Sequence, residues 1–298
     1  MQRPLIFGEV LFDVFPDRNE VLGGAAFNVA WHLQGFGAHP LFVSAVGQDA
    51  RGDTIRALMK QWGMDDAGLQ TDPVHASGVV QVRITNGQPS YDIVADQAYD
   101  FIRFQRDAFE DAHIGLMYHG SLALRQSGSR NSLFQIQETL QSQRFMDINL
   151  RPPWWNAGDL NALMTGSAWL KLNDEELTSL VESLKLPGTS LQEQAQALRS
   201  HFSSRMVILT CGDRGAKLID EHRVIEKSVP PVDKVADTVG AGDAFSAVCL
   251  LGLLKQWPHE QFLQRALDFA AEICKQRGAT ALNHGLYDTF RNQWGESD

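Results

Sequence analysis

The sequence lacks any uninterrupted apolar segment long enough to cross a bilayer. Its longest apolar stretch lies around Ala244–Leu254, well short of the roughly 18 residues that a membrane span requires. The N-terminal stretch Met1–Val14 is interrupted by polar residues and is followed by no small-residue cleavage site. We therefore expect neither a membrane span nor a signal peptide.

Positive charge is also scarce. The chain carries 26 Lys and Arg against 36 Asp and Glu, which gives a formal net charge of −10. The electrostatic field of this negative charge repels polyanions, so we expect no nucleic-acid partner and no binding to anionic membranes. A small phosphate ligand remains compatible with it, because a few local N–H groups and a metal ion act over short distances.

Cysteine is rare as well. The three cysteines show no C-x-x-C spacing and cannot all pair within one chain, a pattern typical of the reducing cytoplasm. The nine histidines form no H-E-x-x-H pattern, so no zinc site is predicted.

Strand-like and helix-like segments alternate along most of the chain. The N-terminal part shows short strands at Leu5–Phe7 and Val10–Val14, a helix at Ala25–Leu33 and a strand at Pro40–Val46. Further elements of both kinds are expected at Gly115–His119, Ser129–Gln141, Phe145–Ile148, Ala168–Leu172, Glu175–Leu184, Leu191–His201 and Met206–Thr210. This order predicts an α/β fold with a central, mostly parallel sheet flanked by helices.

The segment Gly78–Ala95 has a different character. Polar and apolar residues alternate on both sides of Asn86-Gly87, which predicts a β-hairpin and hence a small accessory sheet. No repeat or low-complexity linker divides the chain, so residues 1–298 are expected to form one domain.

A glycine-rich turn leads into a helix at Asp237-Thr238-Val239-Gly240-Ala241-Gly242-Asp243. Glycines let the backbone approach a ligand closely, and the free N–H groups at a helix start favour an anion such as phosphate. In the first turn, the helix end stabilises a negative charge, so we expect Asp243 to be ionised at neutral pH and able to accept a hydroxyl proton. Taken alone, a structural turn with a capping aspartate explains this segment equally well.

The stretch matches the D-T-x-G-A-G-D signature of the ribokinase-like (PfkB) carbohydrate kinases. Gly23-Gly24-Ala25-Ala26-Phe27-Asn28 resembles the sugar-side G-G-x-x-x-N motif of the same family, and the similarity runs from Gly8 to about Ala279. The resemblance implies a ribokinase-like fold with a β-sheet lid formed by about residues 10–22 and 78–104. It also implies that Gly240, Ala241 and Gly242 present N–H groups to the transferring phosphoryl group, while Asp243 takes the proton of the sugar hydroxyl.

On the sugar side, the resemblance implies that Asp13, Gly24 and Asn28 contact the substrate. A carboxylate only accepts hydrogen bonds, whereas an amide both donates and accepts, so Asp13 and Asn28 complement each other toward a polyol. Without the resemblance, Asp13 is interpreted as a turn residue at a strand end and Asn28 as a surface residue of a helix.

The run Asp147-Ile148-Asn149-Leu150-Arg151 resembles the D-x-N-x-R segment of fructokinases and related ketose or keto-acid kinases. This implies sugar-side roles for Asn149 and Arg151, with an exposed salt bridge as the alternative for Arg151. Tyr91 and Phe101 are expected either to form aromatic walls of the sugar site or to pack inside the lid.

Two segments resemble the nucleotide side of the family. Lys171-Leu172-Asn173-Asp174-Glu175-Glu176 has the N-x-x-E spacing, and Thr210-Cys211-Gly212-Asp213-Arg214-Gly215 has the T-x-G-x-x-G turn. An acidic helix start and a β-turn explain the same residues without a ligand. The residues implied at the nucleotide are Lys171, Asn173, Glu176, Thr210, Gly212 and Gly215. Glu176 would contact Mg²⁺ through water, and Asp237 is the candidate for a monovalent cation such as K⁺.

The resemblance therefore implies an ATP- and Mg²⁺-dependent kinase, with fructose as the leading acceptor, and the cysteine pattern leads us to expect it in the cytoplasm. The alternatives are another ketose, a keto-deoxy sugar acid or a nucleoside as acceptor, and a sugar-responsive binding protein without turnover. A nicotinamide-dependent oxidoreductase is disfavoured because no G-x-G-x-x-G follows the first strand. An exposed lid edge would also allow a homodimer to form through the lid.

Overall fold

A large twisted sheet organises the computed structural model, which describes residues 2–85, 88–109, 113–232, 235–280 and 282–296. Its strands are β1 (Arg3–Phe7), β4 (Leu41–Gly47), β5 (Leu69–Asp72), β8 (Ile114–His119), β9 (Gln143–Asp147), β10 (Trp169–Asn173), β11 (Met206–Thr210), β12 (Ala216–Ile219) and β13 (Val224–Lys227). They lie in the order β13-β12-β11-β10-β9-β8-β1-β4-β5. The pairs from β11 to β5 are parallel, and β12 and β13 join the edge in antiparallel fashion.

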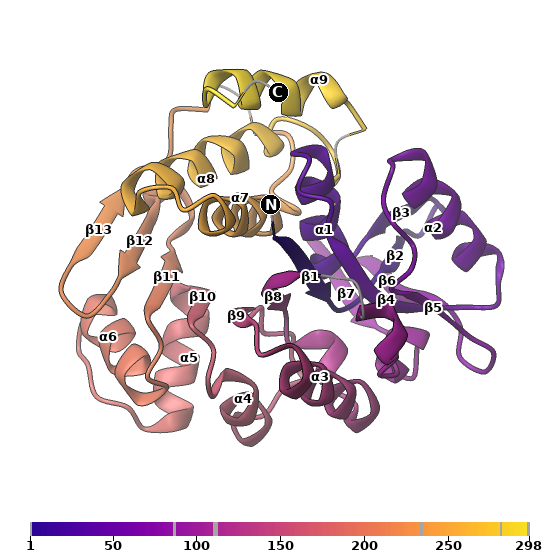
Figure 1. The fold of residues 1–298 in the computed structure, drawn as a ribbon, viewed down its shortest axis with the longest axis horizontal. Coiled ribbons are helices and arrows are strands. Elements are labelled where there is room, and N and C mark those ends of the chain that lie inside the picture. Colours follow the sequence, from indigo (N-terminus) through magenta and orange to yellow (C-terminus); the bar gives the residue numbers. More distant parts are fainter. Residues whose placement is uncertain (1, 86–87, 110–112, 233–234, 281, 297–298) are drawn as a thin grey trace.

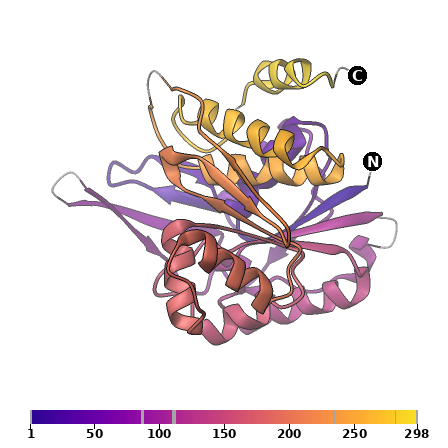
Figure 2. The same ribbon diagram turned by 90° about the vertical axis from the view of Figure 1, so that its left-hand side faces the viewer.

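Helices cover both faces of this sheet (Figures 1 and 2). One face carries α1 (Ala25–Gly35), α2 (Ala50–Gln61), α7 (Ala241–Leu254), α8 (His259–Ile273) and α9 (His284–Gln293). The other carries α3 (Ser127–Leu140), α4 (Ala157–Met164), α5 (Asp174–Leu184) and α6 (Leu191–His201). Side chains of a strand alternate between the two faces, so Ile6 belongs to the first core and its neighbours Leu5 and Phe7 to the second.

A second, four-stranded sheet lies beside the first. It consists of β2 (Leu11–Val14), β3 (Glu20–Gly23), β6 (Gly78–Thr85) and β7 (Gln88–Ile93), in the order β3-β2-β6-β7. The parallel pairing of β2 with β6 joins the two segments that were expected to form one small sheet. The hairpin of β6 and β7 is also as expected, but its central Asn86-Gly87 lies outside the described residues.

The predicted fold class is confirmed, and most of the element bounds agree within two residues. Helices α2, α4 and α9 were not predicted from the sequence. Short 3₁₀ helices connect the elements at η1 (Ala98–Phe101), η2 (Arg106–Phe109), η3 (Leu122–Leu124) and η4 (Gly212–Arg214).

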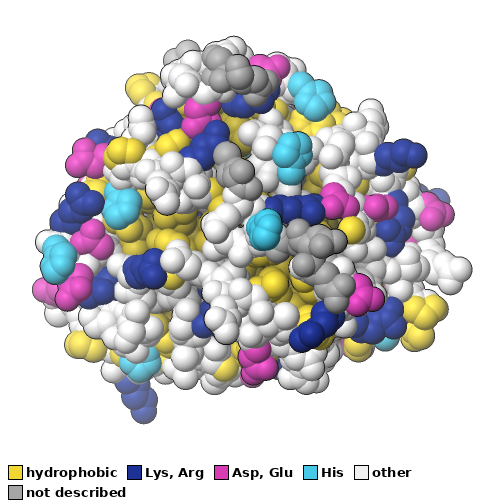
Figure 3. Space-filling model, viewed as in Figure 1, with side chains coloured by type: hydrophobic (Ala, Val, Ile, Leu, Met, Phe, Trp, Pro, Cys, Tyr) yellow, Lys and Arg dark blue, Asp and Glu magenta, His cyan; other side chains and the backbone are white. Residues whose placement is uncertain are grey.

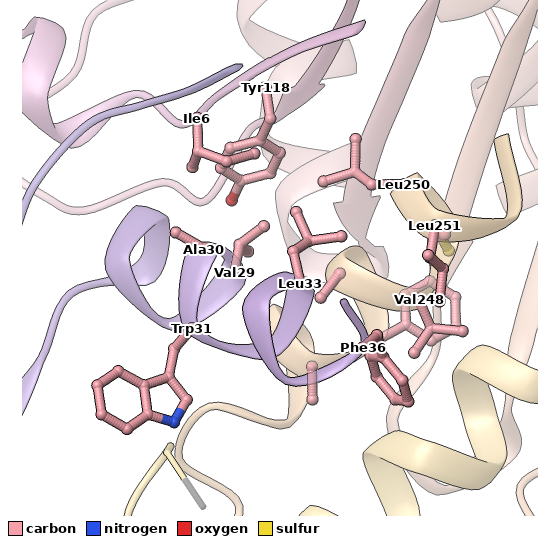
Figure 4. Close-up of a cluster of buried hydrophobic side chains, with 14 of the residues drawn as sticks. Ile6, Val29, Ala30, Trp31, Leu33, Phe36, Tyr118, Val248, Leu250 and Leu251 are labelled. Carbon is pink, nitrogen blue, oxygen red and sulfur yellow. The ribbon is translucent and has the colours of Figure 1, made fainter. Parts of the chain in front are cut away.

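Helices α1 and α7 pack directly against each other, and this contact brings distant parts of the chain together. In Figure 4, Leu33 of α1 and Phe36, which directly follows the helix, lie on the side of α1 that faces α7, while Trp31 points away from it. Trp31 stacks on Trp62, with ring centroids 4.8 Å apart. Because the apolar residues of α7 are buried along almost its whole length, the position of its first turn is set by the core.

The surface in Figure 3 shows acidic and basic side chains interspersed, with apolar side chains between them. No helix in the described part of the chain has the length and apolarity needed to cross a bilayer.

Candidate active site

The first turn of α7 and the first turn of α1 meet at a direct side-chain contact. Asn28 Nδ2 donates to Asp243 Oδ2 at 2.7 Å. Asn28 is only 4% exposed, and its other amide atom, Oδ1, is buried without a hydrogen-bond partner. The alternative of a surface helix residue is therefore wrong for Asn28, which lies at the centre of a polar site.

Asp243 is not a helix cap. The N-cap of α7 is Gly240, with φ 79°, and the helix has no side-chain cap. Burial raises the pKa of Asp243 to about 7, although the hydrogen bond from Asn28 and the charge of Lys171 lower it. The expectation that Asp243 is ionised at neutral pH is thus corrected to partial ionisation, since loss of hydration outweighs the favourable helix end.

Gly240 occupies a position that only glycine fits. A Cβ there would lie 2.3 Å from Ala279 Cβ, and the positive φ would strain any other residue. This close approach fixes the turn before Ala241 and Gly242, the residues whose N–H groups were predicted to meet a phosphoryl group.

A buried ionic network lies directly under this turn. Lys171 Nζ donates to Asp147 Oδ1 and Oδ2 at 3.0 and 2.9 Å, and Ser246 Oγ donates to Asp147 Oδ2 at 2.7 Å. A Cβ on Gly242 would lie 3.4 Å from Lys171 Nζ. Lys171 was predicted at the nucleotide, but the structure pairs it with Asp147, below the turn.

The expected sugar-side residues gather on the other side of Asp243. A Cβ on Gly23 would lie 3.8 Å from Asp13 Oδ2 and 4.0 Å from Asn28 Oδ1, so these two oxygens border the same space. Burial raises the pKa of Asp13 to about 6, and the positive charge of Arg151 lowers it in part. Gly24 precedes α1 with φ 109°, and a Cβ there would lie 2.8 Å from the backbone oxygen of Glu9.

Glu9 holds the start of α1 from outside the helix. Its Oε1 accepts a hydrogen bond from Ala25 N at 3.0 Å, while Oε2 is buried without a partner. Burial raises the pKa of this carboxyl group, against the hydrogen bonds that it accepts from backbone amides. Glu9 thereby supports the helix turn that carries Asn28.

Arg151 is exposed and forms no ion pair within the described ranges. Its charge nevertheless acts on Glu9, Asp13, Tyr91 and Asp243. The salt-bridge alternative for Arg151 is therefore not supported, and its guanidinium group faces the polar site. A positive group there favours an anionic or hydroxyl-rich ligand.

The two expected aromatic walls lie in different places. Tyr91 is 53% exposed on β7, and its pKa is raised first by burial of the hydroxyl and then by the charges of Asp13 and Asp237. It therefore faces the site. Phe101 stacks on His75, with ring centroids 3.6 Å apart, and packs near Gly128 at the start of α3.

Asn149 lies two residues after the end of β9, with φ 43°. Its backbone oxygen accepts a hydrogen bond from Ser121 Oγ at 3.1 Å. The positive φ marks the bend after β9 that turns the following residue, Leu150, toward α5.

Asn173 and Glu176 form a reciprocal capping box at the start of α5. Glu176 Oε2 accepts from Asn173 N at 2.9 Å, and Oε1 accepts from Leu150 N at 2.7 Å. Burial raises the pKa of Glu176, and Lys171 lowers it in part.

Each carboxylate oxygen of Glu176 accepts one backbone N–H group, which leaves a lone pair on each oxygen for a water molecule. In the described part of the chain, no group of three His, Cys, Asp or Glu side chains is placed to hold an ion. Mg²⁺ commonly keeps several waters and binds through substrate phosphates. The water-mediated role of Glu176 stays a prediction.

The predicted nucleotide turn follows β11. Thr210 pairs in register with Asn173, so the ends of β10 and β11 lie side by side. A Cβ at Gly212 would meet no atom within 4 Å, whereas one at Gly215 would lie 2.0 Å from the backbone oxygen of Lys227. Gly212 therefore borders open space, and Gly215 is required by the fold itself.

Asp237 connects two loops near the turn. Its Oδ1 accepts from Val239 N at 3.0 Å and its Oδ2 from Gly278 N at 3.4 Å. It lies close enough to Tyr91 and Cys274 for its charge to raise the pKa of each, after the effect of burial.

Sequence reasoning gave no role to Asp147, Ser246 or Tyr118. Burial raises the pKa of Tyr118 well above its ordinary value, and the charges of Asp147 and Asp243 raise it further. Asp147 begins the D-x-N-x-R run, and Ser246 follows Asp243 by one helical turn. That spacing was the available signal for a shared helix face.

A separate surface hollow of about 720 Å³ lies at the amino ends of β9, β10 and β11. Its cations include Arg144, which donates to Thr165 O at the C-terminal end of α4. Positive side chains offset the partial negative charge of a helix C-terminus. In parallel sheets, ligands bind at the opposite, carboxyl ends of the strands, where the groups described above converge.

Comparison with known proteins gives a consistent result. The model of the pfkB family carbohydrate kinases matches residues 13–284. A putative sugar kinase of Pyrococcus horikoshii is 27% identical over 238 residues, which cover 78% of this chain and 73% of that protein.

Solved structures have the same fold. A fructokinase of Xylella fastidiosa with bound ATP superposes with a TM-score of 0.86 at 21% identity, covering 99% of this chain and 100% of that one. An aminoimidazole riboside kinase of Salmonella enterica, complexed with aminoimidazole riboside and an ATP analogue, gives a TM-score of 0.82 at 23% identity, covering 97% and 99%.

Proposed function

Because the chain belongs to the pfkB family of carbohydrate kinases, we propose that it transfers the γ-phosphoryl group of ATP to a sugar hydroxyl, with Asp243 as the base. The observation that carries this proposal is the convergence at Asp243. The start of α7 provides a glycine turn, and α1 provides a buried amide that donates to the carboxylate. A carboxyl group with a pKa near 7 is well matched to accept a proton at neutral pH.

The two substrates approach Asp243 from opposite sides. Asp13, Asn28, Tyr91 and Arg151 border the sugar side and are able to orient hydroxyl groups. On the other side, Thr210 and Gly212 border the space assigned to the nucleotide. The N–H groups after Gly240 would stabilise the charge on the transferring phosphoryl group, where alignment and charge neutralisation contribute most of the rate.

Fructose is the proposed acceptor. Two features support it: the D-x-N-x-R segment and the similarity to relatives named fructokinase. The competing acceptors are another ketose, a keto-deoxy sugar acid and a nucleoside. Arg151 supports the sugar acid, since a guanidinium without an ion pair among the described residues would bind a carboxylate well. The nucleoside is supported by the likeness to the riboside kinase.

The test is an assay of the purified protein with Mg-ATP and a panel of these acceptors, in which ADP and the phosphorylated product are both measured. We expect turnover with one acceptor, most rapid with fructose, and a loss of at least about a thousandfold in kcat for Asp243→Asn with little change in acceptor binding. Normal turnover by this variant would remove Asp243 from its role. Acceptor binding without turnover of the wild-type protein would favour the sensor function.

Further proposals complete this assignment. We propose that the chain works as one kinase domain, that the small sheet acts as a lid that excludes water, and that Asp237 borders a K⁺ site.

The edge strands β3 and β7 offer a surface for homodimer formation. Light scattering at several concentrations tests this proposal, and a persistent monomer contradicts it. The free cysteines agree with a reducing compartment such as the cytoplasm.

A further inference from the structure

The buried network under the glycine turn connects side chains of β9, β10 and α7. Asp147 ends β9, and Lys171 lies directly opposite it on β10 in the register of the sheet. Ser246 comes from α7, one turn after Asp243. Asp147 is 1% exposed, Lys171 is 7% exposed, and Ser246 is fully buried.

The hydrogen bonds of this network are well satisfied. Asp147 accepts from Lys171 through both oxygens and from Ser246 through one of them. Lys171 thereby uses two of its three N–H groups, and its ammonium group lies next to Gly242, where an added Cβ would be 3.4 Å from Nζ. A buried ion pair by itself is weak evidence of a contribution to stability, so the position of this one under the turn calls for another explanation.

We propose that Asp147, Lys171 and Ser246 form a positioning unit, which holds the first turn of α7 in place and balances the charge of Asp243. This inference rests on the proposed function, because it assigns the unit to the base of that reaction. None of the three residues need touch the substrate. They act through Asp243 and through the turn above Lys171.

The charges in the unit act on Asp243 in opposite directions. Asp147 raises the pKa of Asp243, and Lys171 lowers it. For Lys171 itself, burial lowers the pKa, but the charges of Asp147 and Glu176 raise it more, so it remains a cation. The other groups that face Asp243 are Asn28 on α1, Arg151 after β9 and Tyr118 on β8.

Two single substitutions should therefore move the titration of Asp243 in opposite directions. Lys171→Met leaves Asp147 and Glu176 without their cation, so the titration midpoint of Asp243 should rise by about one pH unit. Asp147→Asn removes the repelling charge and leaves Lys171 unpaired, so the midpoint should fall by a similar amount. A purely structural role would destabilise both variants without this difference in sign.

The measurement is ¹³C NMR of full-length protein labelled at the aspartate side-chain carboxyl carbon, without substrates. The resonance of Asp243 is assigned by its loss in Asp243→Asn. Midpoints that move in the same direction, or that do not move, overturn the inference. If Lys171→Met fails to fold, Asp147→Asn decides alone: a lower midpoint supports the unit and an unchanged one overturns it.

The matched control is a second buried ion pair away from Asp243. Arg125 donates to both oxygens of Asp100 at 2.7 Å, and the two side chains are 3% and 0% exposed. Asp100→Asn should lower thermal stability to a similar degree but leave the midpoint of Asp243 unchanged. A shift of the midpoint in this control would mean that general loosening, and not the local charges, causes the effect.

Ser246→Ala tests the positioning without a change of charge. It should leave the midpoint of Asp243 in place and lower kcat about tenfold, with KM for both substrates little changed. Unchanged kcat would exclude Ser246 from the unit. A protein that phosphorylates no acceptor contradicts the proposed function, whereas an Asp243 midpoint that stays unchanged in both charge substitutions contradicts the positioning unit.

Discussion

The amide of Asn28 donates to the carboxylate of Asp243 across a separation of 215 residues in the sequence. This bond lowers the pKa of a carboxyl group that burial raises. Asn28 therefore keeps a usable fraction of Asp243 ionised at neutral pH, in addition to any contact that it makes with the sugar.

Replacement of Asn28 by alanine should raise the apparent pKa that governs kcat/KM by about one unit and reduce kcat/KM at pH 7 about tenfold or more. Activity should recover in part at higher pH, where Asp243 ionises without help. Asn161→Ala, at an exposed position of α4, serves as the control. A uniform loss of activity at every pH would show that Asn28 acts only on the substrate.

For the wild-type protein, kcat/KM for the acceptor should rise with pH, reach half of its maximum near pH 7 and level off about one pH unit higher. The reason is that Asp243 must lose its proton to act as a base, and its pKa in the free protein is about 7. Steady-state rates at low acceptor concentration, from pH 5 to 9, measure this directly. A profile that is already level at pH 5 would assign the base to a more acidic group.

Asp243→Asn should make the folded protein more stable at pH 8. The pKa of this carboxyl group is raised from an ordinary value of 3.8 to about 7 in the folded chain. Its contribution to stability is therefore fully present below about pH 4 and is lost as the pH rises through 7. Asparagine has no charge to bury, so the free energy of unfolding should increase by an amount on the order of 2 kcal/mol.

Urea denaturation at pH 8 and pH 5 tests this prediction. The gain should be clearly larger at pH 8, since the wild-type carboxyl group is mostly protonated at pH 5. An equal gain at both values would mean that packing, and not charge, separates the two proteins.

Arg151→Gln should raise KM for the acceptor about tenfold and change kcat less, because the guanidinium group faces Asp13 and Tyr91 on the sugar side. The effect should be largest if the acceptor carries a carboxylate. Arg205→Gln, at the opposite ends of the strands, is the control. A fall in kcat alone would place Arg151 at the transferring phosphoryl group.

Acid should destabilise the protein through two buried histidines. Burial lowers the pKa of His32 to about 3 and that of His119 to about 4, from an ordinary value of 6.5. Their contribution to stability is present above about pH 6.5 and is lost as the pH falls through these lowered values.

The urea midpoint should therefore fall between pH 6.5 and 4, and less steeply in His32→Phe, whose ring would join Phe269 and Tyr287. His222→Gln, at an exposed position, should follow the wild-type curve. The same slope in all three proteins would remove His32 from this explanation.

The fold and the glycine turn were predictable because their signals are local. Each strand or helix can be predicted from a short stretch of sequence, and the turn before Asp243 is determined by seven consecutive residues. The two motifs that contain Asn28 and Asp243 occur in the same order as in the carbohydrate kinases that the chain resembles, and this resemblance placed both residues in one site.

The pairing of Lys171 with Asp147 was not predictable in this way. It depends on the register of β9 against β10, and a shift by one residue would send each side chain to the other face of the sheet. The protonation of Asp243 was misjudged for a related reason: its carboxyl group is only partly exposed and lies against Asn28 of α1, and no local pattern connects α1 to α7.

The close approach of Gly240 and Ala279 also limits how this protein can be recombined with its relatives. A Cβ at position 240 and the methyl group of Ala279 compete for one volume, so a donor segment that enlarges either position damages the other. Chimeras should therefore exchange the stretch around 237–243 together with the loop around 278–280. Crossover points between these two segments would separate residues that must be inherited as a pair.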